Sequence, residues 1–257
     1  MTTKRGRVPY LSLIIPAYNE HTRLLSGVST AISYLKKQRY SWELILVDDG
    51  SVPSVVHVLR RGYRAKTFPY ALDKLPIIIH RLPKNRGKGA ALKAGVALGR
   101  GHLIVFSDVD LSVSITYLSP MLRALARYNI VIASRRLAKS DIIIHQSFGR
   151  ELSGRIFTAL SNIICNTQVA DATCGFKGFQ KVVAKEIFAQ SRITRWVFDT
   201  EILFLARKRR WEIKEFGVAW ANTSGSKVRP FDSVISFIDL FRIRWNDMRG
   251  RYDTKKA

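Results

Sequence analysis

Short apolar runs, rich in isoleucine, leucine and valine, recur along the first half of the chain, and helix-like stretches separate them. Runs of this length without polar alternation are typical of strands that are buried on both faces. We therefore predict strands over residues 11–15, 43–47, 77–80, 103–107 and 130–133. Strands that alternate with helices predict an α/β fold, a single domain with a mostly parallel sheet flanked by helices.

Polar residues follow each predicted strand at its carboxyl end. The segments are PAYNE after the first strand, DDGS after the second, NRGKGAALKAG after the third, SDVD after the fourth and SRR after the fifth. Because parallel strands end at the same edge of a sheet, these acids, amides and basic groups should gather there. We expect the ligand site at that edge.

Two aspartates separated by one valine, Asp108 and Asp110, follow the fourth strand. In an extended chain both would project to one side and Val109 to the other. Neighbouring carboxylates repel unless a cation lies near them, and Mg²⁺ or Mn²⁺ binds one or two carboxylates together with phosphate oxygens of a substrate. We interpret the pair as a metal site that holds a diphosphate. The alternative is a loop in which the aspartates cap the next helix.

A second acidic pair, Asp48 and Asp49, follows the second strand, where a carboxylate can accept hydrogen bonds from ribose hydroxyls or a base N–H. An Asx turn is the alternative. The basic turn with Arg86 and Lys88 opens an alanine-rich helix and matches neither the dinucleotide fingerprint nor the P-loop. Such a turn suits contacts to a diphosphate or a base, and a solvated lysine at an ordinary helix start is the alternative.

The composition favours an anionic partner. The 257 residues are 47% hydrophobic and include 43 Lys and Arg against 19 Asp and Glu, a formal net charge of +24. Nucleic acid, a phosphorylated substrate or an anionic membrane would each match this charge. A nucleic-acid-binding protein is the alternative from another class, but we expect no nucleic-acid partner because no known binding motif is present. The only cysteines, Cys165 and Cys174, predict core residues in a reducing compartment.

No apolar run approaches the roughly 20 residues that span a bilayer, and no signal peptide is recognisable. We therefore expect a cytoplasmic protein that associates peripherally with the cytosolic face of a membrane. Apolar residues near the C-terminus follow three- and four-residue steps, namely Phe231, Val234, Ile235, Ile238, Phe241, Trp245 and Met248. This pattern predicts an amphipathic helix that lies in a membrane surface, or packs on the body of the protein or on a second subunit.

Taken together, the segments IIPAYNE, LVDDGS, NRGKGAAL and SDVDLS resemble the motifs of family 2 inverting glycosyltransferases with the GT-A fold. In the second half, DATCGFKGF, RWVFDTEILFLA, IKEFGVAW, GSKVRPF and DLFRIRW resemble the dolichyl-phosphate β-glucosyltransferase branch, with mannosyltransferases as near relatives. The resemblance implies a GT-A domain over residues 8–230, followed by the C-terminal helix and basic tail over residues 231–257. It also implies transfer of a hexose to dolichyl or polyprenyl monophosphate with Mg²⁺ or Mn²⁺ as cofactor, and it favours UDP-glucose as donor.

For the donor, the resemblance implies a base and ribose pocket formed by Pro16, Tyr18, Glu20 and Asp48. Asp49 would support this pocket, and Lys88 or Arg86 would face the nucleotide. Asp108 would reach the ribose or diphosphate and Asp110 would hold the metal. Ser112 stands where mannosyltransferase relatives carry a further glutamine ligand.

For the acceptor, the resemblance implies that Arg135 and Arg150 bind the phosphate, and that Lys177, Lys227 and Arg229 complete a basic ring. A lipid phosphate is already anionic near pH 7, so the reaction needs no strong general base. If a base exists, the candidates are Asp199 and Glu201. The alternative for both is a structural role as ordinary acids at a helix N-terminus. Asp171 is expected to play a supporting role only.

Two other glycosyltransferase functions stay open at this point. One is a GDP-mannose-dependent polyprenyl-phosphate mannosyltransferase. The other is an enzyme of the same fold with an acceptor that is not a lipid. The motifs alone do not choose the sugar, because that choice depends on the shape of the pocket around it.

Overall fold

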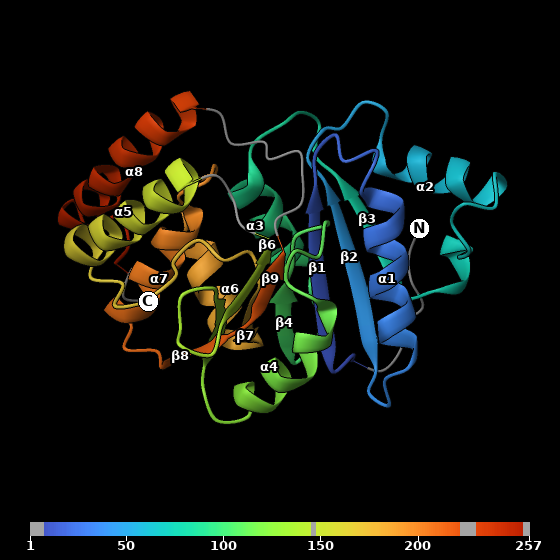
Figure 1. The fold of residues 1–257 in the computed structure, drawn as a ribbon, viewed down its shortest axis with the longest axis horizontal. Coiled ribbons are helices and arrows are strands. Elements are labelled where there is room, and N and C mark those ends of the chain that lie inside the picture. Colours follow the sequence, from blue (N-terminus) through green and yellow to red (C-terminus); the bar gives the residue numbers. More distant parts are fainter. Residues whose placement is uncertain (1–7, 145–147, 222–229, 254–257) are drawn as a thin grey trace.

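Seven strands form the central sheet, in the order β3-β2-β1-β4-β7-β5-β8 (Figure 1). The structure is a computed structural model that describes residues 8–144, 148–221 and 230–253. The strands are β1 (Leu11–Ala17), β2 (Trp42–Asp48), β3 (Ile77–Arg81), β4 (Leu103–Phe106), β5 (Ile130–Ser134), β7 (Lys177–Gln180) and β8 (Ile213–Gly217). Only β7 runs antiparallel to its neighbours in this sheet, between β4 and β5. A separate parallel pair joins β6 (Asp141–Ile144) to β9 (Ala219–Ala221).

The five predicted strands are confirmed, each within two residues of its expected ends. Four further strands, β6, β7, β8 and β9, were not predicted from the sequence. The segments of β7 and β8, KGFQ and IKEFG, lack the run of branched apolar residues that marks the five predicted strands. β7 forms because it pairs with β4 and β5 in the middle of the sheet. The local sequence does not indicate a strand at this position.

Helices cover both faces of the sheet and create two cores (Figure 1). On one face lie α3 (Lys88–Leu98), α6 (Lys181–Gln190) and α7 (Phe198–Lys208). On the other lie α1 (Leu24–Lys36), α2 (Val55–Arg64) and α4 (Leu118–Leu125). Alternate strand residues enter opposite cores, so that Ile14 and Phe106 pack in the first while Leu13 and Val105 pack in the second. This two-sided burial explains why the strands are continuously apolar.

Two longer helices, α5 (Phe148–Cys165) and α8 (Pro230–Met248), lie side by side at one end of the molecule (Figure 1). The ring centroids of Phe157 and Phe237 are 6.2 Å apart where the two helices meet. The C-terminal helix therefore packs on the body of the protein, which is one of the arrangements that its amphipathic pattern allowed. Its division from the rest of the chain at residue 230 stays a prediction.

The buried face of α8 is not the apolar stripe that the sequence indicates. Leu240 and Ile243 enter the core, whereas the stripe residues Ile238, Phe241, Trp245 and Met248 are exposed. Ile235 is half-buried, and the side chains of Phe231 and Val234 lie outside the described residues. Cys165 and Cys174 are both free and buried, as predicted. No helix in the described part of the chain has the length and apolar character needed to cross a bilayer.

Candidate active site

The strand order reverses next to β1. The chain passes from β1 to β2 and β3 on one side, and then returns to place β4 on the other side of β1. Ligands of open α/β sheets bind at such a reversal, beyond the carboxyl ends of the strands. Arg23, on the turn before α1, joins the two sides, 2.6 Å from Glu20 and 3.2 Å from Asp110. The segments after β1 and β4 therefore meet at this edge, as expected, although the sequence analysis did not single out Arg23.

The acidic pair after β2 shapes the polypeptide turns at this edge. Asp48 is buried, and its carboxylate accepts hydrogen bonds from the backbone N–H groups of Ser51 (2.7 Å) and Val55 (3.0 Å). Both of its oxygens thus hold the turn that leads into α2. For Asp48 the geometry supports the turn alternative, and its predicted contact with a nucleotide stays a prediction.

Asp49 fixes the basic turn that precedes α3. Its two carboxylate oxygens accept hydrogen bonds from the backbone N–H groups of Arg86 and Gly87, each at 2.8 Å. Gly87 has a φ of 98°, and a Cβ there would lie 2.5 Å from the carbonyl oxygen of Thr194, so glycine is required. Asp49 therefore supports the basic turn, and its expected support of a nucleotide pocket stays a prediction.

Lys88, the first residue of α3, reaches the aspartates that follow β4. Its Nζ lies 2.6 Å from Oδ1 of Asp108. Burial works to lower the pKa of Lys88, but the carboxylates of Asp108 and Asp199 together raise it above its ordinary value. The other carboxylate oxygen of Asp108 lies against Gly175, where an added Cβ would come within 2.0 Å of it. The ammonium of Lys88 is thus held beside Asp108 at the N-terminus of α3. A helix N-terminus with a lysine beside it attracts anionic groups of a ligand.

Asp108 and Asp110 do not lie on an extended strand, so the prediction that strand geometry points them to one side is wrong. β4 ends at Phe106, and the backbone turns so that the Leu111 N–H donates to the Asp108 carbonyl at 3.2 Å. Each carboxylate is paired with a different cation, Lys88 for Asp108 and Arg23 for Asp110. Ser112 donates through Oγ to Asp110 at 2.8 Å.

The donor set at this turn fits a divalent cation. Asp108 and Asp110 are hard oxygen donors of the kind that Mg²⁺ and Mn²⁺ prefer. Within the described residues no group of three or more His, Cys, Asp or Glu side chains could hold a metal ion. The protein would therefore supply one or two carboxylates, and a diphosphate and water would supply the other ligands, which is how Mg²⁺ is commonly bound.

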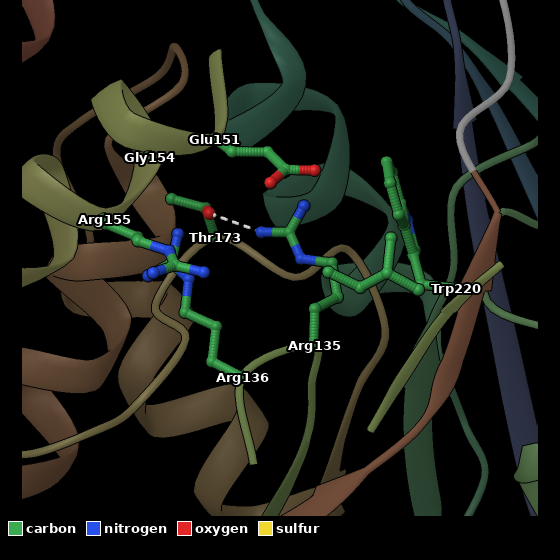
Figure 2. A pocket seen from close by; sticks show the side chains of 8 residues that line it. Arg135, Arg136, Glu151, Gly154, Arg155, Thr173 and Trp220 are labelled. Atoms are coloured by element: carbon green, nitrogen blue, oxygen red, sulfur yellow. Dashed lines mark hydrogen bonds between the residues drawn. The ribbon is translucent and has the colours of Figure 1, made fainter. Parts of the chain in front are cut away.

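A cavity of about 400 Å³ opens beyond the carboxyl end of β5 (Figure 2). It is lined by Arg135, Arg136, Ile142, Glu151, Gly154, Arg155, Thr173 and Trp220. Three of these residues are arginines, of which the sequence analysis selected only Arg135. The doublet of arginines at residues 135–136 was the signal that could have identified Arg136.

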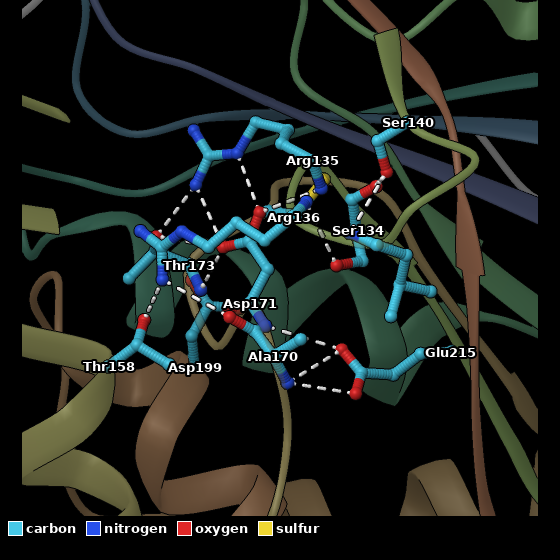
Figure 3. Close-up of polar contacts among 12 residues, drawn as sticks. Ser134, Arg135, Arg136, Ser140, Thr158, Ala170, Asp171, Thr173, Asp199 and Glu215 are labelled. Atoms are coloured by element: carbon cyan, nitrogen blue, oxygen red, sulfur yellow. Dashed lines mark hydrogen bonds and ion pairs between the residues drawn. The ribbon is translucent and has the colours of Figure 1, made fainter. Parts of the chain in front are cut away.

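Arg135 is anchored by a buried carboxylate (Figure 3). Its Nε and Nη2 donate to the two oxygens of Asp171 at 2.7 and 2.9 Å, and Nη2 also donates to Thr173 Oγ1 at 2.8 Å. The guanidinium carbon lies 5.4 Å from the ring centroid of Trp220. Burial alone would raise the pKa of Asp171, but the paired guanidinium holds it well below its usual range. Asp171 thus has the supporting role predicted for it.

Arg136 is held by different partners on the other side of the cavity (Figures 2 and 3). Its Nη1 donates to Thr158 Oγ1 on α5 and to the Ala170 carbonyl. The Glu215 carboxylate in turn accepts the backbone N–H groups of Ala170 and Asp171, at 2.8 and 3.2 Å. The loop that positions both arginines is therefore fixed by two carboxylates, those of Asp171 and Glu215.

Lys177 is fully buried, and the expectation that it joins a basic ring around the acceptor is wrong. Its Nζ donates at 2.6 Å both to Asp199 Oδ1 and to the Cys174 carbonyl. Asp199 is the partner of this lysine and has almost no exposed surface. In a buried pair each group satisfies the other, which explains two residues that were expected to face the substrate.

Glu201 lies at the start of α7 and is also buried. Its carboxylate accepts the backbone N–H groups of Arg192 (2.9 Å) and Ile193 (2.8 Å) and the hydroxyl of Tyr252 (2.6 Å). These three donors show that it ties the segment before α7 to the C-terminal tail. The alternative of a structural acid at a helix N-terminus is correct for Glu201, and the interpretation as a general base is wrong.

We predict that Tyr252→Phe lowers the free energy of unfolding by about 1.5–3 kcal/mol, because the buried Glu201 carboxylate loses a hydrogen-bond donor. Activity per folded molecule should be unchanged. Denaturant unfolding and initial rates on the same preparation measure the two effects. Tyr63→Phe, on the exposed side of α2, is the matched control. A large loss of turnover in a stably folded Tyr252→Phe enzyme would contradict the structural role of Glu201.

The remaining predicted residues stay predictions. Tyr18 follows β1 at the edge of the sheet and is 38% exposed, and Pro16 lies within β1. Arg150 belongs to α5, but its side chain lies outside the described residues, as do Lys227 and Arg229.

A strand reversal that carries acids, a basic turn and a neighbouring arginine cavity defines this fold as that of a nucleotide-sugar glycosyltransferase of the GT-A type. Residues 12–188 match the model of the family described as Glycosyl transferase family 2. The chain belongs to that family.

Several curated relatives carry one name. A dolichyl-phosphate beta-glucosyltransferase of Trichomonas vaginalis is 34% identical, covering 91% of this chain and 72% of the relative. The human dolichyl-phosphate beta-glucosyltransferase is 33% identical over 94% of this chain and 77% of the relative. The Saccharomyces cerevisiae protein of the same name is 31% identical over 96% of this chain and 78% of the relative.

Solved structures with the same fold are more distant in sequence. Glucosyl-3-phosphoglycerate synthase from Mycobacterium tuberculosis, in complex with Mn²⁺, UDP and phosphoglyceric acid, superposes with a TM-score of 0.63 at 16% identity, covering 97% of this chain and 80% of that one. A complex of the same enzyme with Mg²⁺ and UDP has a TM-score of 0.62 at 17% identity, covering 97% and 81%. At this identity the likeness establishes the fold.

Proposed function

We propose that the protein transfers glucose from UDP-glucose to dolichyl or polyprenyl monophosphate, with inversion at the anomeric carbon. The observation that carries the proposal is the cavity at the end of β5, because three arginines line it. Arginine binds phosphate through two parallel hydrogen bonds, which suits a phosphate acceptor better than a sugar hydroxyl. The names of the curated relatives support the same choice of acceptor and sugar.

In this proposal the acceptor is its own nucleophile. A phosphate monoester oxygen is anionic near pH 7 and attacks the anomeric carbon as the bond from that carbon to the UDP oxygen breaks. No proton has to be removed, so no general base is needed. The burial of both candidate bases, Asp199 and Glu201, supports this view. Arg135 and Arg136 would offset the repulsion between the acceptor phosphate and the departing diphosphate.

On the donor side, the turn at the carboxyl end of β4 would receive the diphosphate. Lys88 stands at the start of α3 and would bind a phosphate oxygen, and Asp49 keeps its turn in place. Asp108 and Asp110 would hold Mg²⁺ or Mn²⁺, which when bound stabilises negative charge on the leaving group. Arg23, now paired with Asp110, would have to share that carboxylate. Tyr18 and Glu20, at the end of β1, would border the nucleotide.

Because the acceptor is a lipid, we place the enzyme at a membrane surface, on its cytosolic face, where nucleotide sugars are available. The net charge of +24 supports attraction to anionic headgroups. This setting differs from that of a transferase with a water-soluble acceptor, and the difference can be measured directly.

The test is a donor and acceptor screen with radiolabelled sugar. We expect label from UDP-glucose to enter the organic phase in the presence of a polyprenyl phosphate and Mn²⁺, faster than label from GDP-mannose. Omitting the lipid phosphate is the control for donor hydrolysis. Label that stays in the aqueous phase with every lipid phosphate would disprove the lipid acceptor, and preference for GDP-mannose would disprove the donor.

A further inference from the structure

Helix α8 has two apolar faces, and only one of them is covered. Leu240 and Ile243 are fully buried against the body of the protein. On the opposite side, Ile238, Phe241, Trp245 and Met248 are 61%, 64%, 51% and 70% exposed. These four residues follow three- and four-residue steps and therefore form a continuous stripe on the helix. We call them the α8 stripe.

The neighbouring helix α5 has an exposed stripe of the same kind. Leu152, Ile156 and Ile163 lie four and seven residues apart and are 44%, 46% and 79% exposed. Ile143 and Ile144, at the end of β6 shortly before α5, are exposed as well. Of the fifteen large apolar side chains exposed in the described part of the chain, seven are on α5 and α8. A concentration of this kind marks an interaction surface.

Arginines border the α8 stripe. The side chain of Arg242 is 64% exposed and that of Arg244 is 46% exposed, and the guanidinium of Arg249 lies 4.5 Å from the ring centroid of Trp245. Two of these arginines pair with acids of the same helix, Arg242 with the buried Asp239 at 3.7 Å and Arg244 with Asp247 at 3.2 Å. Asp247 also pairs with Lys208, so it is shared between two cations. The combination of exposed rings and arginines matches a bilayer interface with anionic lipid.

We propose that the exposed faces of α5 and α8 dock on an anionic membrane, with the α8 stripe inserted at headgroup depth. A second copy of the chain is a poorer occupant, because a two-fold interface would bring the same arginine-bordered face against itself. A neutral membrane would offer no anionic headgroups to the exposed arginines. The inference deepens the proposed function, since a lipid acceptor requires a docking face, but the observations behind it do not depend on the reaction.

The docking face adjoins the arginine cavity through α5. Glu151, Gly154 and Arg155 line the cavity (Figure 2). Leu152 and Ile156 of the same helical turns are exposed. One helix thus carries cavity residues on one side and the apolar stripe on the other. Docking through that stripe would set the cavity beside the headgroup layer, where the phosphate of an embedded lipid lies.

The first test is sedimentation of the full chain with vesicles of phosphatidylcholine that contain about 30% phosphatidylglycerol, which is the anionic lipid. Phe241→Ser with Trp245→Ser should weaken binding at least about 10-fold. Arg242→Gln and Arg249→Gln should each weaken it about 5-fold, with little effect on pure phosphatidylcholine. Val182→Ser on α6 and Arg60→Gln on α2 are matched exposed controls and should bind as wild type.

Depth is measured by fluorescence. Of the five tryptophans only Trp245 is exposed, so lipids with brominated acyl chains should quench its emission selectively. Trp245→Phe should remove most of that quenching and keep vesicle binding. Unchanged binding by the Ser and Gln variants, or absence of quenching in wild type, would overturn the proposal. So would a dimer in light scattering that the Ser variant converts to monomer, because the face would then bury a second copy.

Turnover separates this inference from the proposed function. With a short-chain, water-soluble prenyl phosphate, the Phe241→Ser and Trp245→Ser variant should react as wild type, and only turnover of vesicle-embedded acceptor should fall. If wild type glycosylates neither acceptor but binds vesicles through this face, the reaction is wrong and the docking face stands. If both acceptors react and the variant is unaffected on vesicles, the docking face is wrong and the reaction stands.

Discussion

Replacing Asp110 with asparagine is expected to lower turnover by about 100- to 1,000-fold, the usual loss when one charge-stabilising group is removed from an active site. The variant keeps an oxygen that can accept the Ser112 hydrogen bond, so the turn after β4 should persist. It loses the negative charge that a divalent cation needs. The measurement is the initial rate with UDP-glucose as a function of Mn²⁺ concentration, together with the unfolding curve.

The structure offers two controls for this variant. Asp73→Asn changes an exposed aspartate in the 3-10 helix before β3 and should leave both curves unchanged. Arg23→Gln keeps Asp110 but breaks its ion pair, which tests the pair without removing the carboxylate. Full turnover and an unaltered Mn²⁺ requirement in Asp110→Asn would show that this carboxylate binds no metal. An equal loss in Arg23→Gln would assign the effect to the ion pair.

The extent to which the sequence predicts this molecule differs between backbone and side chains. The strands were predictable because burial on both faces requires runs such as LSLII, and their shared edge follows from parallel pairing. β7 was not predictable, because it is held by pairing with β4 and β5, which are distant in the chain. The predicted α8 helix exists, but its stripe faces outward, since amphipathicity alone does not tell which neighbour covers a face.

For charged residues, the neighbouring sequence did not predict the ion-pair and hydrogen-bond partners. Lys177 belongs to a motif with glycines on both sides, yet it is neutralised by Asp199, which lies 22 positions away in the chain. Glu201 resembles a catalytic acid until Tyr252 and two backbone donors are seen around it. Arg135, predicted to bind the acceptor phosphate, lines the cavity, while its anchoring by Asp171 depends on a loop fixed by Glu215. These partners are set by the tertiary structure.

Replacing Arg135 with methionine is expected to destabilise the fold as well as to impair acceptor binding. Asp171 has no exposed surface, and the side chain of Arg135 supplies two hydrogen bonds to it. Removing one partner of a buried pair costs about 3–5 kcal/mol because the other charge is left unpaired. Turnover should fall at least about 100-fold, since the cavity loses a phosphate ligand. Urea unfolding and initial rates at saturating UDP-glucose measure the two losses.

The pH dependence of this loss has a defined sign. In wild type the pKa of Asp171 is held low by Arg135, so its stabilising contribution is complete above an unfolded pKa of about 3.9 and disappears as the pH falls further. In Arg135→Met, the raising effect of burial on the pKa of Asp171 is no longer opposed by the guanidinium, so that pKa should rise and the cost of the buried charge should fall as the pH is lowered. The stability difference between wild type and variant should therefore be largest near pH 7 and should shrink toward pH 4.

A double variant separates the structural role of Arg135 from its role toward the acceptor. Arg135→Met with Asp171→Asn removes both charges and should recover most of the lost stability at pH 7, because no buried charge is left unpaired. Turnover should stay low, since the phosphate ligand is still missing. Arg207→Met, on the side of α7 where its guanidinium binds the carbonyls of Thr167 and Gln168, is a matched arginine control outside the cavity. Recovery of turnover in the double variant would mean that Arg135 acts only by holding the fold, and the acceptor phosphate would then have to be assigned to Arg136 and Arg155.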